Sequence, residues 1–348
     1  MKDTISEEEM IEQVQAILEE RGRTVMEMAR KTVLEEKIES KEVREALEYF
    51  MNEKVTPSSI TPAFLSLVCE AVGGDPKITT SIAILMSLIN GAVDIHDDII
   101  DQSKSKRSRP TVFGKFGKDV ALLAGDALLF KGLTLIHEVV ETGIPAEKVV
   151  VISDIIKKTF FELGAAVATE LQFRERIDVS SEEYLKVVRT KGATMEALAR
   201  IGSILGNGTQ KEIEALSAYG RLLGMIHILN DDLADMFDFE EFVNRIKNEH
   251  IPLQVIYALE KSRDKSEINL ILQKKKKTKS DIKKIVKFTN KAEGPVFVAE
   301  KIMSISNEAT YHLQSAKYNK IYLKKLIDVF IPLIIENKKE SVTMDPKV

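Results

Sequence analysis

The chain has 348 residues, of which 44% are apolar, enough for a substantial core in one large domain or two. Fifty Lys and Arg side chains against 54 Asp and Glu give a formal net charge of −4, which argues against a nucleic-acid partner. The single cysteine, Cys69, lies in the apolar run AFLSLVCEAV, so we expect a buried structural thiol and no disulfide.

The N-terminal stretch MKDTISEEEM is acidic and lacks an apolar core, so it does not resemble a signal peptide. The most apolar segment, residues 78–93, is interrupted by Asn90, is closed by Asp94 and is shorter than a membrane span. We therefore expect a cytoplasmic protein without a transmembrane segment.

Apolar residues recur at helical spacing along nearly the whole chain, from EEMIEQVQAILEE through VVVISDIIKKTFFELGAAVATELQF to EALSAYGRLLGMIHILNDDLADMF. Strand patterns are scarce. Gly and Pro predict breaks at residues 73–76, 110–114, 143–145, 206–208 and 252. The sequence therefore predicts an all-α fold of about a dozen helices.

No change of composition and no Pro-rich linker divides the chain, and its most apolar segments lie in the middle. Buried central helices inside a polar shell have this pattern, so we expect a single domain over residues 1–348. The lysine-rich run at residues 274–284 is expected to be a solvated loop between helices, with contact to an anionic membrane surface as the alternative.

Three aspartates, Asp97, Asp98 and Asp101, occupy positions i, i+1 and i+4 of an expected helix. Residues at i and i+4 lie one turn apart on the same face, so Asp97 and Asp101 can hold one ion together. Repulsion among three close carboxylates destabilises a helix, so a cation is expected to relieve it.

The same spacing recurs at Asp231, Asp232 and Asp235, again after a long apolar helix. One such cluster alone is explained equally well as a solvated acidic helix end. Two identical clusters favour a facing pair, which would form a cage of hard oxygen ligands for Mg²⁺ and bind it together with phosphate oxygens.

Basic residues follow the first cluster at Lys104, Lys106, Arg107 and Arg109. Lysine and arginine donate hydrogen bonds to phosphate oxygens, so beside magnesium they would complete a pocket for a diphosphate. Charge balance on a surface loop is the alternative for this stretch taken alone.

The order of these motifs resembles that of the all-trans isoprenyl diphosphate synthases, or polyprenyl synthetases. HDDIID is followed by KRSRPTV, by ALLAGDALL at residues 121–129, by Tyr184 and Lys191, and by DDLAD seven residues after Gly224. The similarity extends over about residues 49–259, and two Asp-Asp-x-x-Asp motifs in the right order make it specific.

The resemblance implies an isoprenoid-synthase bundle whose two motifs face a central cavity. It further implies a magnesium-dependent prenyltransferase, in which three Mg²⁺ ions bridge the aspartates to an allylic prenyl diphosphate. Carried over position by position, the metal ligands are Asp97, Asp98 and Asp101 from the first motif and Asp231, with Asp232 and Asp235 behind it, from the second. Lys106 and Lys191 would hold the allylic diphosphate, and Arg107 the diphosphate of isopentenyl diphosphate, the second substrate.

The resemblance also suggests roles for residues around the motifs. We expect His96 beside the metal ligands rather than among them, and a structural role for His227; contact of Gln172 with the site is left open. Ala92 and Val93 are small at the positions where aromatic residues stop short-chain products in relatives, so an open floor would admit chains of about twenty carbons or more.

The chain departs from the family at the isopentenyl diphosphate site. In place of Gly-Gly-Lys-x-x-Arg-Pro it has TPSSITP, so Ser58 and Thr61 stand where two cations belong, and Asn90 replaces the usual His or Gln. Each charge-assisted contact is worth about 1.5–3 kcal/mol, so losing two weakens binding by roughly two to four orders of magnitude. The candidates to compensate are Lys54, Arg44, Arg245 and Lys247, and Asp94 has no explanation from the sequence.

The sequence is compatible with three alternative functions. The first is a prenyltransferase with a degraded extender site, and the second is a terpene-synthase-like enzyme that passes the prenyl cation to water or another acceptor. The third, a non-catalytic subunit of a heteromeric synthase, is disfavoured because both aspartate motifs are retained. We expect the first, as a homodimer like its relatives, with a heteromer as the alternative.

Overall fold

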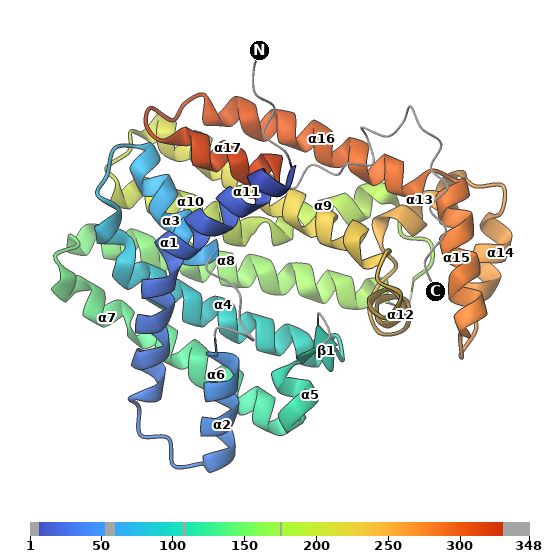
Figure 1. Cartoon of the computed structure of the whole chain (residues 1–348), viewed down its shortest axis with the longest axis horizontal. Coiled ribbons are helices and arrows are strands. Elements are labelled where there is room, and N and C mark those ends of the chain that lie inside the picture. The colour runs from blue at the N-terminus through green and yellow to red at the C-terminus, as the bar shows by residue number, and fades with distance from the viewer. Residues whose placement is uncertain (1–6, 53–59, 107–108, 175, 330–348) are drawn as a thin grey trace. The chain divides into compact units, whose positions relative to one another are not determined.

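The computed structural model describes residues 7–52, 60–106, 109–174 and 176–329, and these ranges are almost entirely helical, which confirms the all-α prediction (Figure 1). The helices of the first half are α1 (Glu7–Leu34), α2 (Lys41–Phe50), α3 (Ile60–Ala71), α4 (Thr80–Ile100), α5 (Val112–Phe116), α6 (Lys118–Thr134), α7 (Ile136–Val139) and α8 (Ala146–Phe173). The second half contains α9 (Ser181–Lys191), α10 (Ala193–Leu205), α11 (Gln210–Asp235), α12 (Phe239–Asn248), α13 (Leu253–Lys261), α14 (Lys265–Leu272), α15 (Lys279–Lys291), α16 (Gly294–Leu313) and α17 (Lys320–Asp328).

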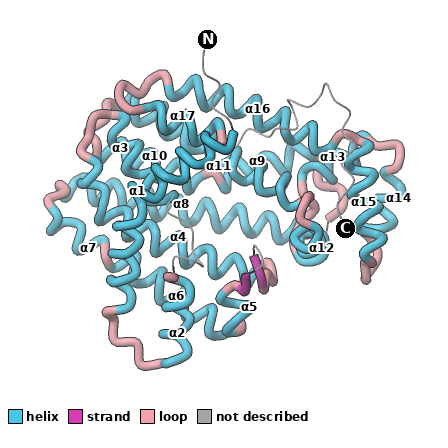
Figure 2. The backbone as a smooth tube through the Cα atoms, in the orientation of Figure 1, coloured by secondary structure: helices cyan, strands magenta, loops and turns pink. Residues whose placement is uncertain are grey.

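Two 3₁₀ turns, η1 (Pro76–Thr79) and η2 (Val140–Thr142), precede α4 and α8. Figure 2 shows one small exception to the helical pattern, a hairpin of β1 (Ser105–Lys106) and β2 (Arg109–Pro110), whose strands are antiparallel. Most expected breaks fall between elements, for example between α10 and α11 and between α12 and α13. The described helices outnumber the expected dozen because elements as short as α5 and α7 are too short to show a helical period.

The contacts group the chain into two compact units. Unit 1 comprises Met1–Lys157, Ala197–Ser217 and Leu313–Lys325, and unit 2 comprises Lys158–Glu196, Ala218–His312 and Leu326–Val348. The expectation of a single domain stays a prediction.

In unit 1, helix α4 packs along α6, and α1 packs against α3 and α4 (Figure 1). Small residues of α6 allow this close approach: a Cβ atom on Gly132 would lie 2.9 Å from Ile89 Cγ1, and one on Gly125 would lie 2.5 Å from His96 Nε2. The packing fixes the C-terminal end of α4, which carries the first aspartate motif.

In unit 2, helix α13 packs against α9, α14 and α15. The buried core around it includes Phe242 and Ile246 of α12 together with Val255, Ile268 and Ile285. This core positions α12, which follows the second aspartate motif along the chain.

Cys69 is buried, as predicted, and burial raises the pKa of its thiol to about 11. The lysine-rich run forms the connection between α14 and α15 and the first turns of α15. By length and composition alone, two helical stretches of the described residues, Pro76–Ile100 and Lys118–Thr142, could cross a membrane. Within an apolar window of 18 residues, 61% of the first and 33% of the second is buried in the protein. The absence of a transmembrane segment stays a prediction.

Candidate active site

The first aspartate motif closes α4 in unit 1, where Asp97 and Asp98 lie in the last turn and Asp101 is the C-cap residue. Asp98 is buried, with 8% of its surface exposed, and its Oδ1 lies 2.7 Å from Lys106 Nζ. Burial raises the pKa of the Asp98 carboxyl, and the nearby Lys106 charge partly offsets this. The pKa of Lys106 is raised, because the charges of Asp98, Asp97 and Asp94 outweigh the effect of its burial.

The β1–β2 hairpin holds Lys106 beside the motif, with Lys106 paired to Arg109 in the strand register. Thr111 ties the base of the hairpin, since its hydroxyl donates to the Ser103 carbonyl at 2.7 Å. Gly114 is required here because a Cβ atom at this position would lie 1.8 Å from the carbonyl oxygen of Lys104. The basic stretch therefore folds back onto the aspartates that precede it.

His96 turns from the motif toward α6, where its Nε2 lies 3.2 Å from Asp126 Oδ1 in the AGDALL segment. The role of His96 beside the metal ligands stays a prediction. On α4, one turn before the first motif, Ala92 is fully buried and Val93 is half-buried.

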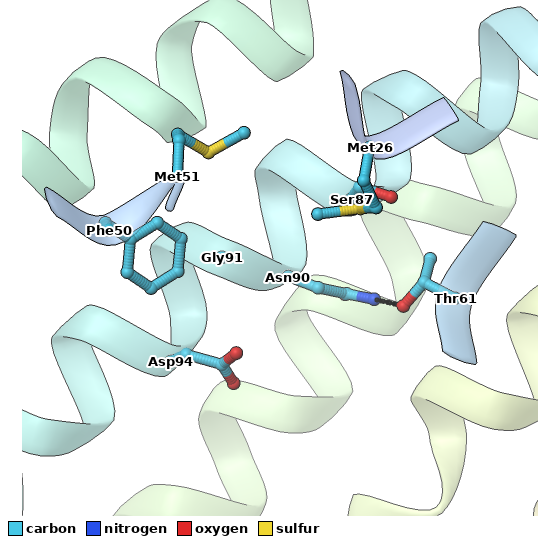
Figure 3. A pocket seen from close by; sticks show the side chains of 8 residues that line it. All are labelled: Met26, Phe50, Met51, Thr61, Ser87, Asn90, Gly91 and Asp94. Atoms are coloured by element: carbon cyan, nitrogen blue, oxygen red, sulfur yellow. Dashed lines mark hydrogen bonds between the residues drawn. The ribbon is translucent and has the colours of Figure 1, made fainter. Parts of the chain in front are cut away.

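A small pocket opens beside α4 in unit 1 (Figure 3). Its lining residues are Met26, Phe50, Met51, Thr61, Ser87, Asn90, Gly91 and Asp94. The Asn90 amide donates to the Thr61 hydroxyl at 3.0 Å, and the Asp94 carboxylate lies on the same wall as Asn90, one turn further along α4. Two positions that the family resemblance assigns to the extender site therefore contact each other.

The second motif ends α11 in unit 2, and its three carboxylates lie in different surroundings. Asp231 is half-exposed, with its Oδ2 2.9 Å from Nδ1 of His227. Asp232 is buried, and burial raises the pKa of its carboxyl against the opposing effect of Arg245. Asp235 lies 2.6 Å from Nη2 of Arg245.

A buried polar network surrounds Asp232. The Tyr184 hydroxyl and the Arg245 guanidinium both donate to its carboxylate, and Gln254 Nε2 donates to its backbone oxygen at 2.7 Å. Burial and the charge of Asp232 raise the pKa of the Tyr184 hydroxyl well above its usual value, so the phenol stays protonated as a donor. The network fixes the middle aspartate of the motif.

The same network continues to Lys191, the last residue of α9, through Glu170, whose Oε1 lies 3.8 Å from Nε2 of His250. His250 Nε2 lies 3.2 Å from the Tyr184 hydroxyl, and Lys191 Nζ lies 2.9 Å from Glu170 Oε2. Burial, together with the positive charges of Arg245, Lys191 and Arg174, lowers the pKa of His250 well below its usual value. His250 is therefore neutral at physiological pH.

The structure brings Asp98 to Lys106 and Asp231 to His227, while Gln172 is exposed near the end of α8. Arg107, Ser58 and Lys54 lie outside the described residues. No three His, Cys, Asp or Glu side chains in the described ranges are arranged as ligands of one ion. The donors nevertheless fit magnesium by their chemistry, because carboxylate oxygens are the hard ligands that this ion prefers.

The sequence did not reveal the partners Tyr184, His250 and Arg245 of the second motif. Tyr184 and His250 belong to other segments, and packing brings them to Asp232. Arg245 lies on α12, separated from the motif by the turn after α11. Tyr184 appeared in the sequence only as part of the family resemblance and Arg245 only as a candidate cation, and neither was linked to Asp232.

The polyprenyl synthetase family model matches residues 40–289. A short chain isoprenyl diphosphate synthase of Methanothermobacter thermautotrophicus is 34% identical over 61% of this chain and 66% of its own length, and a geranylgeranyl diphosphate synthase of Methanosarcina mazei is 33% identical over 58% and 63%. These alignments thus span less than two thirds of each curated relative.

Solved structures extend the likeness of the fold to nearly the whole chain. A geranylgeranyl pyrophosphate synthetase from Pyrococcus horikoshii superposes with a TM-score of 0.81 at 26% identity, covering 92% of this chain and 98% of that one. A synthetase from Geoglobus acetivorans superposes with a TM-score of 0.79 at 24% identity, covering 90% and 99%. Since the family model alone covers well over half of the residues, the chain belongs to the polyprenyl synthetase family.

Proposed function

We propose that this protein is a magnesium-dependent prenyltransferase of the polyprenyl or geranylgeranyl diphosphate synthase type, which ionises an allylic prenyl diphosphate. The observation that carries the proposal is the presence of two Asp-Asp-x-x-Asp motifs, each at the C-terminal end of a long helix, α4 or α11, in a member of this family. Relatives named isoprenyl and geranylgeranyl diphosphate synthases support the substrate class.

The proposed magnesium ligands are drawn from the six aspartates of the two motifs, and as many as three ions are expected. Magnesium, when bound with the substrate, supplies positive charge that stabilises the departing diphosphate most strongly in the transition state. Sharing of the ions by both motifs stays a prediction from the sequence.

Lys106 and Lys191 are the proposed clamps on the allylic diphosphate, with Arg107 as a further candidate. Each lysine already lies within 3 Å of a carboxylate, Asp98 for Lys106 and Glu170 for Lys191. When the allylic carbon–oxygen bond breaks, its electron pair leaves with the diphosphate, and an ammonium group within hydrogen-bond reach stabilises the growing negative charge. Binding of one diphosphate by both lysines stays a prediction from the sequence.

The alternative function depends on how an extender would fare beside α4, where the small pocket lies. Its lining includes the carboxylate of Asp94, the amide of Asn90 and the hydroxyls of Thr61 and Ser87, and no Lys or Arg among the residues described there. A diphosphate anion would be repelled by Asp94 and would find no cation in this lining. Transfer of the prenyl cation to water or to another acceptor, as in terpene synthases, stays the alternative.

We also propose that the protein self-associates through helix α6. Helix α6 exposes large apolar side chains at Leu122, Leu123, Phe130 and Leu133, and Phe130 is 72% exposed. The spacing of these residues puts them on one face of the helix, and a contiguous exposed apolar face is typical of an interface. A second copy of the chain, paired about a two-fold axis, is the proposed partner, and another prenyl synthase is the alternative.

Incubation of the protein with Mg²⁺, farnesyl or geranylgeranyl diphosphate and labelled isopentenyl diphosphate tests the proposal. Labelled longer chains support elongation, whereas diphosphate release without incorporation of label supports the alternative function. Asp97→Ala and Asp231→Ala are expected to abolish either reaction. Full activity in both variants, or no reaction of the unaltered protein with any allylic diphosphate, contradicts the proposal.

A further inference from the structure

Helices α14 and α15 form a helical hairpin within unit 2, in which residues 273–278 join the two helices (Figure 1). Residues 265–291 contain ten lysines and no arginine against two acidic residues, which gives a formal charge of +8. Since the whole chain has a formal charge of −4, all of its other residues together carry −12. Positive charge is therefore concentrated in one hairpin of an otherwise acidic protein.

The lysines of α15 lie on the face of the helix that is turned away from the core. Ile282 and Ile285 are buried in the core of unit 2, whereas Lys279, Lys283 and Lys287 are exposed. These three lysines are spaced at i, i+4 and i+8, so they lie along one face of the helix. They form a basic stripe on the outer surface of the hairpin.

The turn that precedes α15 has a defined conformation. Thr278 and Asp281 form a capping box, and Lys277 Nζ donates to the Lys274 carbonyl at 3.2 Å. Lys277 is half-buried, and its burial together with the charge of Lys247 on α12 lowers the pKa of its ammonium group. Lys277 thus lies in a positive potential, which a nearby anionic surface would relieve.

Ion pairs neutralise only part of the charge of the hairpin. Lys274 Nζ lies 2.6 Å from Asp281 Oδ1, and Lys279 Nζ lies 3.5 Å from Glu240 Oε1. Five further exposed lysines form no ion pair with any residue that the structure describes, and these are Lys275, Lys276, Lys283, Lys284 and Lys287. This set of five is called the hairpin lysines below.

The composition of the hairpin favours a lipid surface over a nucleic acid as its partner. All its cations are lysines, which act as point charges, whereas arginine provides the planar fork that binds single phosphates in nucleic acids. Its only aromatic residue, Phe288, is packed against the core, so it is not available to stack on a base. Leu270, in the last turn of α14, is 64% exposed, and such an apolar side chain beside basic residues can enter the boundary between headgroups and acyl chains.

We propose that the α14–α15 hairpin is a docking surface for an anionic lipid bilayer, which the hairpin lysines bind by their charge and Leu270 by its apolar side chain. Clusters of basic residues are attracted to anionic bilayers in this way. The surface uses no residue of either aspartate motif, so the inference goes beyond the proposed function and does not depend on it.

Cosedimentation of the full chain with vesicles of phosphatidylcholine and phosphatidylserine, mixed about two to one, tests the proposal, with vesicles of phosphatidylcholine alone as the reference. Each lysine near an anionic surface strengthens binding about fivefold, which corresponds to about 1 kcal/mol. The triple variant Lys283→Gln, Lys284→Gln, Lys287→Gln is therefore expected to bind the mixed vesicles about a hundredfold more weakly. Leu270→Asn is expected to weaken binding severalfold, and added salt should release the unaltered protein because it screens the attraction.

The matched control replaces Lys31, Lys37 and Lys41, three exposed lysines of unit 1, by Gln. It makes the same change of net charge and should weaken binding by less than about threefold, since these lysines lie outside the proposed surface. Both triple variants are expected to keep the melting temperature of the unaltered protein, because every altered side chain is exposed.

Equal weakening by the two triple variants overturns the proposal, and so does equal binding of the unaltered protein to vesicles with and without phosphatidylserine. If the vesicles bind no protein and Lys283, Lys284 and Lys287 are instead required for binding a single-stranded RNA, the surface serves a nucleic acid and the proposal is wrong. None of these outcomes bears on the prenyltransferase reaction, which is measured separately with soluble substrates.

Discussion

The side-chain amide of Asn90 donates a hydrogen bond to the Thr61 hydroxyl over 3.0 Å, within the pocket that also contains Asp94. The family resemblance places an extender-binding His or Gln at position 90 and an arginine at position 61. Two neutral side chains that satisfy each other have less hydrogen-bonding capacity left for a second substrate. The exposed carboxylate of Asp94 adds repulsion toward any anion that enters.

Asp94→Lys is expected to lower the KM for isopentenyl diphosphate about tenfold, because an attractive charge replaces a repulsive one, a change of about 1.4 kcal/mol. Steady-state kinetics with saturating allylic diphosphate and Mg²⁺ measure it. Glu141→Lys makes the same charge change at an exposed site outside the pocket lining and serves as the control. Equal KM values for the two variants would show that the pocket does not bind the extender.

Val93→Phe is expected to shorten the products of any elongation. Val93 is half-buried, one turn before the first motif, whereas Ala92 is fully buried, so a phenylalanine at 92 would overpack the core at a cost of about 1–3 kcal/mol. The distribution of product lengths after dephosphorylation, compared by chromatography with that of Val93→Leu, measures the effect. An identical distribution in the two variants contradicts a role for this position in chain length.

The sequence predicts those features of the fold that local chemistry determines. The helical period predicted the helices, and Gly and Pro predicted boundaries such as those before α8 and α13, because both signals act over a few residues. The hairpin that carries Lys106 was not predicted, since its strands have two residues each and no alternating pattern.

The candidate site was predictable only in part, because some of its contacts depend on packing between segments far apart in the chain. The spacing of the aspartates predicted which residues share a helix end, and the basic stretch was expected beside the first motif. The pairing of Arg245 with Asp232, and of Tyr184 with the same carboxylate, depends on packing between helices far apart in the chain. Equal spacing in the sequence therefore concealed the burial of Asp232 and the exposure of Asp231.

Phe130→Glu is expected to convert a homodimer into monomers, because it introduces a charge into the exposed apolar face of α6. Sedimentation velocity of the full chain at several concentrations measures the change. Ile321→Glu, at an exposed apolar residue of α17, is the matched control and should leave association unchanged. A monomeric unaltered protein, or dissociation by the control alone, contradicts the proposed interface.

His250 is expected to make stability depend on pH. Its pKa in the folded state is well below the usual value because burial and three nearby cations disfavour the imidazolium, whereas in the unfolded chain it takes up a proton near pH 6.5. The unfolded state therefore binds more protons as pH falls below about 6.5, and the contribution of His250 to the free energy of unfolding decreases there by up to about 1.4 kcal/mol per pH unit. Chemical denaturation measures the free energy of unfolding between pH 7.5 and 5. This free energy should decrease less for His250→Gln than for the unaltered protein as the pH is lowered. His137→Gln, at an exposed histidine, is the control. If the free energy of unfolding of His250→Gln depends on pH as steeply as that of the unaltered protein, His250 is not a buried neutral imidazole.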